Sequence, residues 1–87
     1  GDERIGEKVC SVGQIINVER LSTGLYMGGL LRPDLRVVEF VTKLNVVDDQ
    51  RVRMCGVFLG ESSYTTKNKE EKRTIMIGLT AAWNLAE

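Results

Sequence analysis

Hydrophobic and polar residues alternate along much of this chain, with the two-residue period of a β-strand. The clearest alternation covers residues 35–47, where Val38 and Phe40 fall on one side and Glu39 and Lys43 on the other. Plotted with the 3.6-residue period of a helix, the apolar side chains of this segment scatter around most of the circumference. We therefore expect a strand over 35–47.

Four further segments have the β-branched content or the alternation of strands, and polar or glycine-containing breaks separate them. The expected strands are 9–18, 25–31, 51–60 and 73–82. The expected breaks are 20–24, 32–34 and 48–50. Gly28 and Gly29 predict a bend within the short strand that contains them. The pairing that the pattern defines best is a hairpin between the last two of these strands.

The length of 87 residues predicts a single domain, residues 1–87. Its charged start, residues 1–8, is expected to be a mobile terminus, and the polar residues 61–72 are expected to form a hairpin arm with a solvated tip. The alanine-rich end of the chain, beyond residue 82, favours a helical turn. The predicted fold class is mainly β, an antiparallel meander of four to five strands, with α+β as the variant if a short helical segment forms.

Both sides of the expected strands carry bulky apolar residues, whereas a half-buried antiparallel sheet is apolar on one side only. No long amphipathic helix is expected to cover the second side. The sheet must therefore close into a small sandwich or barrel, or pack as a dimeric sheet or against a permanent protein partner. The residues predicted to form such an interface are Val37, Val41, Val57, Leu59 and Trp83.

The composition restricts the chemistry open to this chain. It contains no histidine, so catalytic triads, histidine metal ligands and the commonest general base are all excluded. Its two cysteines are too few for a four-cysteine zinc site and too far apart for a redox Cys-x-x-Cys motif. We therefore expect no catalytic residues, no metal, no cofactor and no enzyme activity.

Cys10 and Cys55 allow three interpretations. Their apolar neighbours favour two small buried side chains. The second interpretation is a disulfide, which the chain-entropy model values at about 4 kcal/mol for a loop of this length. The third is a reactive thiol. A secreted origin would place the disulfide ahead of the buried pair.

Six basic residues near the expected hairpin form a candidate binding cluster for phosphate or nucleic acid. They are Arg51, Arg53, Lys67, Lys69, Lys72 and Arg73. The chain has 12 basic and 12 acidic residues, whereas nucleic-acid-binding domains usually carry a basic excess. Among the aromatic side chains, only Tyr26 and Tyr64 lie near polar segments, so few are placed to stack on bases. The composition therefore favours a solvated surface over a binding site.

Together these features predict a non-enzymatic structural or interaction protein. It would act through self-assembly or a permanent protein partner, as a subunit of a coat, a shell (a viral one included) or a larger complex. One alternative is a nucleic-acid-binding subunit that uses the basic cluster. Another is a small secreted effector or toxin subunit with one disulfide. The longest segment without a charge, 21–31, is too short to span a bilayer as a helix, so no membrane span is expected.

Overall fold

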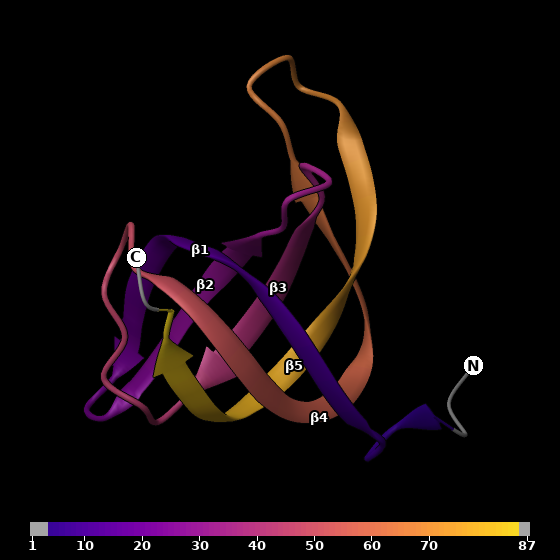
Figure 1. The fold of residues 1–87 in the computed structure, drawn as a ribbon. Helices are drawn as coiled ribbons and strands as arrows, with labels where there is room; N and C mark the ends of the chain where they lie inside the picture. Colours follow the sequence, from indigo (N-terminus) through magenta and orange to yellow (C-terminus); the bar gives the residue numbers. More distant parts are fainter. Residues whose placement is uncertain (1–3, 86–87) are drawn as a thin grey trace.

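A computed structural model describes residues 4–85 as five β-strands that close into a barrel (Figure 1). The strands are β1 (Lys8–Ser22), β2 (Leu25–Leu31), β3 (Val37–Thr42), β4 (Arg51–Thr65) and β5 (Glu71–Asn84). Their order around the barrel is β1-β2-β3-β5-β4, and β4 pairs with β1 to close the ring. The predicted mainly β fold class is confirmed, and among its variants the barrel is the one that forms.

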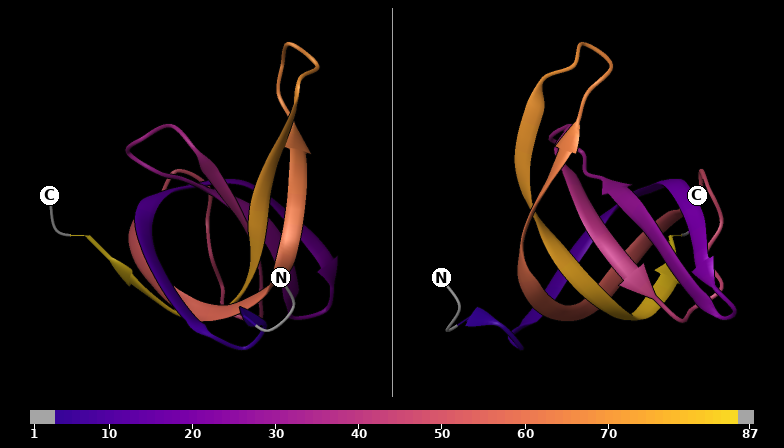
Figure 2. Two further views of the ribbon diagram at one scale, coloured as in Figure 1. Left: turned by 90° about the vertical axis from the view of Figure 1, so that its right-hand side faces the viewer. Right: turned by 180° about the vertical axis from the view of Figure 1, so that it is seen from behind.

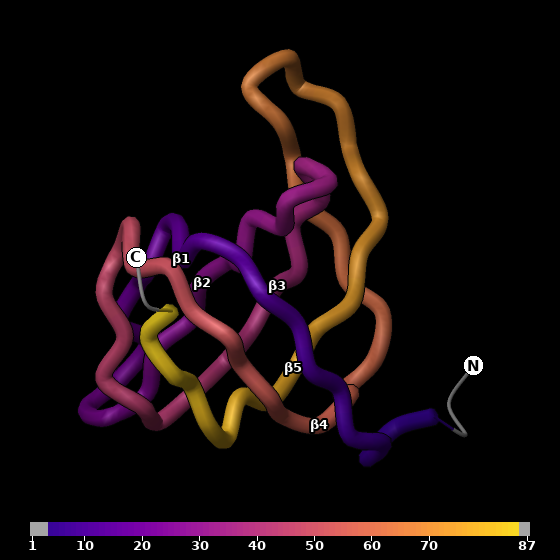
Figure 3. The backbone as a smooth tube through the Cα atoms, viewed as in Figure 1, coloured from indigo at the N-terminus to yellow at the C-terminus, as the bar shows by residue number. Residues whose placement is uncertain are grey.

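The sheet is mixed, because β3 and β5 run parallel to each other. Glu39 lies opposite Met76 in this pair, and Thr42 lies opposite Leu79. Because the partners of β4 are β1 and β5, the chain does not turn back in a hairpin at residues 48–50. It crosses from β3 to β4 instead, as Figure 3 traces, and this crossover distinguishes the barrel from a simple meander.

β3 ends at Thr42, so the prediction of one strand over 35–47 is wrong at its carboxyl end. The Thr42 hydroxyl donates to the Leu79 carbonyl at 3.1 Å and accepts the Leu44 N–H at 3.0 Å. The bond to Leu44 turns the chain out of the strand just after Thr42. Val46 is nevertheless buried in the core cluster, because the crossover loop packs against the barrel.

Alternate side chains of every strand fill the barrel interior. The largest of the fully buried ones are Phe40, Ile15, Leu30, Met54, Ile77 and Val52. The ring of Phe40 fits because Gly28 has no side chain, since a Cβ there would lie 2.9 Å from the ring carbon Cζ. The glycine pair in β2 thus makes room in the core.

β4 and β5 continue beyond the barrel as a two-stranded arm, the most prominent projection in Figure 2. Their pairing runs from Val52 opposite Asn84 to Thr65 opposite Glu71, and a tight turn over 66–70 joins them. The predicted hairpin between 51–60 and 73–82 is therefore confirmed, and its strands are longer than expected. Within the barrel β4 passes close to β5 at Gly56, where a Cβ would lie 2.2 Å from the Gly78 carbonyl oxygen.

The start of the chain is paired in part with β4, and the end of the chain differs from the sequence-based expectation. Residues 1–3 of the predicted mobile terminus lie outside the described residues. In the rest of that segment, the Gly6 N–H donates to the Phe58 carbonyl and the Phe58 N–H donates to the Glu7 carbonyl, each at 2.8 Å. At the other end, β5 stays extended to Asn84 because it remains paired with β4. The short helical segment expected after residue 82 is thus absent from residues 83–85, and residues 86–87 lie outside the described part.

Candidate functional site

The turn between β2 and β3 holds two arginines close together. The Arg32 N–H donates to the Arg36 carbonyl at 2.8 Å, and the Leu35 N–H donates to the Arg32 carbonyl at 2.9 Å. The Asp34 carboxylate accepts the Arg36 N–H at 3.1 Å and lies 3.5 Å from the Arg32 guanidinium. Arg32 and Arg36 therefore stand at the two ends of one closed turn.

A groove of about 530 Å³ lies between this turn and the base of the arm, and we call it the hairpin groove. Its polar lining side chains are Arg32, Arg36, Tyr64, Lys72, Arg73 and Thr74. Tyr64 of β4 and Lys72 of β5 are cross-strand partners, so both project from the same side of the arm. The Thr74 hydroxyl donates to the Val37 carbonyl at 2.5 Å and so ties β5 to β3 beside the groove.

The four cations of the hairpin groove are available to an anion. Three of them contact carboxylates, in the pairs Arg32–Asp34, Lys72–Glu70 and Arg73–Glu61 at 3.2–3.5 Å. Every side chain in these pairs is at least 44% exposed, and such exposed pairs are worth only about 0–1 kcal/mol. Arg36 has no carboxylate within 4.0 Å among residues 4–85. A phosphate can therefore replace these weak contacts at little cost.

Tyr64 also lines a second hollow of about 350 Å³ on the outer surface of β1, β2 and β3, which we call the acidic depression. Its charged residues are Glu19 and Glu39, and no lysine or arginine of the described residues lines it. The Ser62 hydroxyl of the arm donates to the Glu39 carboxylate and holds the arm against β3. Because carboxylates repel phosphate, an anion is expected in the hairpin groove and not in the acidic depression.

The structure separates the six basic residues that the sequence analysis groups together. Lys72 and Arg73 line the hairpin groove. Lys67 and Lys69 lie in the turn at the tip of the arm. Arg51 and Arg53 lie at the far end of β4, because the register sets Arg53 opposite Trp83 and Lys72 opposite Tyr64. The prediction that Arg51 and Arg53 come close to Lys72 and Arg73 is therefore wrong.

Cys10 of β1 and Cys55 of β4 lie opposite each other in the strand pair that closes the barrel. The structure joins them by a disulfide, with their Cα atoms 4.1 Å apart. Cys55 is buried and Cys10 is exposed, so the interpretation of both as buried apolar side chains is wrong for Cys10. The bond therefore links the two strands at the outer surface of the barrel.

Three of the five residues predicted as an interface gather on the outside of the barrel around Gly78. Val41 and Val57 are the neighbours of Gly78 on β3 and β4, and Leu59 reaches over the same glycine. We call these three residues the Gly78 patch. Val37 instead lines the hairpin groove, and Trp83 lies near the end of β5. The assignment of these residues to an interface stays a prediction.

The sequence predicts only a break over residues 32–34 and does not single out Arg32 and Arg36, the two groove cations of the β2–β3 turn. The sequence feature that could have identified these two arginines is their position on either side of a Pro-Asp turn, because a closed turn brings its two ends together. Nothing in the sequence shows that the arm reaches this turn, because that contact depends on the pairing of β5 with β3.

The strand order, with its one parallel β3–β5 pair, resembles the five-stranded Greek-key barrel known as the OB-fold. The structure is similar to the crystal structure of Rim1, a mitochondrial single-stranded DNA-binding protein from S. cerevisiae, with a TM-score of 0.62. The match covers 92% of this chain and 94% of that chain, and 9% of the residues are identical. At this identity the likeness shows the fold alone. No protein-family model and no curated protein sequence matches this chain.

Residues 4–85 contain no group of three or more histidine, cysteine, aspartate or glutamate side chains arranged to hold a metal ion. They also contain no helix with the length and apolar character needed to cross a bilayer.

Proposed function

We propose that this protein is a non-enzymatic binding protein for single-stranded nucleic acid and that the hairpin groove is its primary contact. The observation that carries the proposal is the convergence of four cations and one tyrosine at the base of the arm, on a barrel that resembles a single-stranded DNA-binding protein. The structural similarity to Rim1 supports nucleic-acid binding, which the sequence suggests only as an alternative, more than it supports the main hypothesis of self-assembly or a permanent protein partner. The coat, shell or viral assembly role receives no support from these comparisons.

The phosphates of a bound strand would contact Arg32, Arg36, Lys72 and Arg73. A guanidinium binds a phosphate through two parallel hydrogen bonds, and an ammonium supplies a point charge. Both groups are present in the groove, from the β2–β3 turn on one wall and from β5 on the other. A zero net charge of the whole chain does not oppose this contact, because phosphate responds to the local field of the groove.

A base of the bound strand would stack on Tyr64. This ring lies beside Lys72 and borders both the hairpin groove and the acidic depression. Stacking on an aromatic ring tolerates every base, because every base has a π-face. A base paired in a duplex cannot leave its neighbours without an energetic cost, so the groove favours a single strand over a duplex.

The proposal is tested by fluorescence anisotropy of a labelled oligothymidylate at increasing salt. For four neutralised phosphates, the logarithm of the association constant should fall against the logarithm of salt concentration with a slope of about −2.8. The double variant Arg36→Glu/Lys72→Glu should bind far more weakly. The control for each of the single variants Arg36→Glu and Lys72→Glu is Lys43→Glu, one charge reversal just beyond the end of β3, where the lysine lines a hollow outside the hairpin groove and binding should be unchanged. If the protein shows salt-dependent binding neither to single-stranded DNA nor to single-stranded RNA, the proposal is contradicted.

A further inference from the structure

We infer that Arg53 and Trp83 form a second nucleotide contact on the outer surface of β1, β4 and β5, and that a bound strand reaches it from the hairpin groove by passing Arg32. This inference rests on the proposed function and extends it to a surface outside the groove. Its chemistry is the same in kind: an aromatic ring for a base and a guanidinium for a phosphate.

The register places these side chains next to each other. Arg53 lies opposite Val12 of β1 on one side and opposite Trp83 of β5 on the other. Its neighbours Val52 and Met54 are buried in the core, so Arg53 points outward from the barrel. Trp83 is 53% exposed and Val12 is 40% exposed. The three side chains therefore form one exposed row across three strands.

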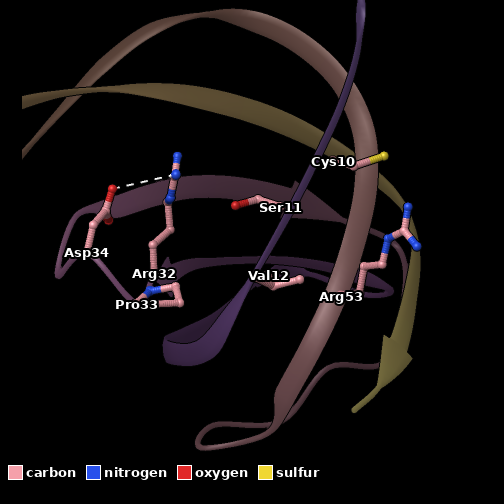
Figure 4. A pocket seen from close by; sticks show the side chains of 7 residues that line it. All are labelled: Cys10, Ser11, Val12, Arg32, Pro33, Asp34 and Arg53. Atoms are coloured by element: carbon pink, nitrogen blue, oxygen red, sulfur yellow. Dashed lines mark ion pairs between the residues drawn. The ribbon is translucent and has the colours of Figure 1, made fainter.

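A hollow of about 490 Å³ connects this row with the β2–β3 turn, and Arg32 and Arg53 both line it. Figure 4 shows Ser11 and Val12 of β1 between the two arginines. Arg32 lines the hairpin groove as well, so one guanidinium borders both hollows. Because the two hollows share Arg32, a strand that follows both would pass from Lys72 to Arg53, although these two residues lie far apart along the β4–β5 pair.

The charges of this row favour a nucleic acid over a second copy of the chain. Arg51 projects on the same side of β4 as Arg53. Neither arginine has a carboxylate within 4.0 Å among residues 4–85. The carboxylate in the hollow, Asp34, already contacts Arg32. In a two-fold dimer through this row, Arg51 and Arg53 would face the same charges of the partner, whereas phosphates would neutralise them.

Trp83 is the only tryptophan of the chain, so its fluorescence reports on this row alone. Wild-type protein is titrated with an unlabelled oligothymidylate of about 16 nucleotides, at the upper end of site sizes for one barrel of this kind. We expect quenching of the Trp83 emission. With a labelled oligomer of the same length, Trp83→Ala and Arg53→Glu should each bind about tenfold more weakly, whereas Trp83→Phe and Arg53→Lys should keep most of the affinity.

The outcomes separate this inference from the proposed function. If Arg36→Glu/Lys72→Glu weakens binding but Arg53→Glu and Trp83→Ala do not, and Trp83 is not quenched, the second contact is absent and the hairpin groove remains the binding site. If the sedimentation mass of the free protein falls in Trp83→Ala with unchanged affinity, the row is an interface between copies and the inference is overturned. If the wild-type protein binds no oligomer at all, both proposals fail.

Discussion

Tyr64 and Lys72 lie directly opposite each other in the β4–β5 arm, and the parallel pairing of β5 with β3 brings both to the two arginines of the β2–β3 turn. The arm thus adds an aromatic ring and two cations, Lys72 and Arg73, to a turn whose charged groove residues are arginines alone. Its base is attached to β3 by the hydrogen bonds of Ser62 and Thr74, so the groove has two supported walls.

Replacing Tyr64 tests the stacking contribution. Tyr64→Ala should reduce the affinity for an oligothymidylate by about fivefold to 150-fold, since a stacked base is worth roughly 1–3 kcal/mol. Tyr64→Phe keeps the ring and should bind nearly as the wild type does. Anisotropy titrations at one salt concentration measure both. Equal losses in the two variants would show that the hydroxyl, and not the ring, makes the contact.

Replacing Leu35 by asparagine should raise the stability of the fold and lower the affinity for an oligonucleotide. It is 78% exposed at the rim of the hairpin groove and has a φ of 67°, a conformation that costs a leucine roughly 1–2 kcal/mol. Leu35→Asn should raise the free energy of unfolding by about 1 kcal/mol, because asparagine tolerates this conformation. It should also weaken oligonucleotide binding, because an apolar contact at the rim is lost.

Leu35→Ala is the control for this pair of effects, because it removes the apolar side chain and keeps the strained conformation. It should weaken binding as Leu35→Asn does, without the gain in stability. Urea unfolding and anisotropy are measured on both variants. A lower stability of Leu35→Asn than of Leu35→Ala would contradict the assignment of strain to this position.

Reduction of the Cys10–Cys55 bond should destabilise the barrel. The bond closes a sequence separation of 45 residues, which the chain-entropy model values at about 4 kcal/mol. Urea unfolding with and without a thiol reductant measures the difference. The double variant Cys10→Ala/Cys55→Ala should resemble the reduced wild type and should not respond to the reductant. Two titratable thiols in the unreduced, unfolded wild type would show that the bond does not form.

Self-association of this chain stays a prediction, and the Gly78 patch is the surface that tests it. Leu59 is 43% exposed there, beside an apolar hollow of about 440 Å³ that Val41 and Val57 line. If copies associate through the patch, Leu59→Glu should lower the mass measured by sedimentation. Leu21→Glu is the matched control, since Leu21 is 50% exposed near the end of β1. A wild-type mass of one chain at high concentration would contradict the prediction.

The alternation of side chains along this chain determined the strands and most of their breaks. Val38 and Phe40 fall inside the barrel and Glu39 outside it, as their two-residue period requires. The early end of β3, which the alternation does not predict, involves two hydrogen bonds of the Thr42 hydroxyl, a local one from the Leu44 N–H and a distant one to the Leu79 carbonyl. The carbonyl of Leu79 and the hydroxyl of Thr42 meet only after β5 has paired with β3, and this pairing ends near the point where β3 ends.

Only the tertiary structure decided which charged residues share a site. The expected hairpin grouped Arg53 with Lys72, but the register of β4 with β5 placed them at opposite ends of a long strand pair. The same register, together with the parallel β3–β5 pair, brought Arg36 to Lys72 across a groove. Local sequence determines the period with which apolar side chains recur, and therefore which segments form strands. Which elements become neighbours depends on how the strands close around one core, a property of the whole chain that no single segment encodes.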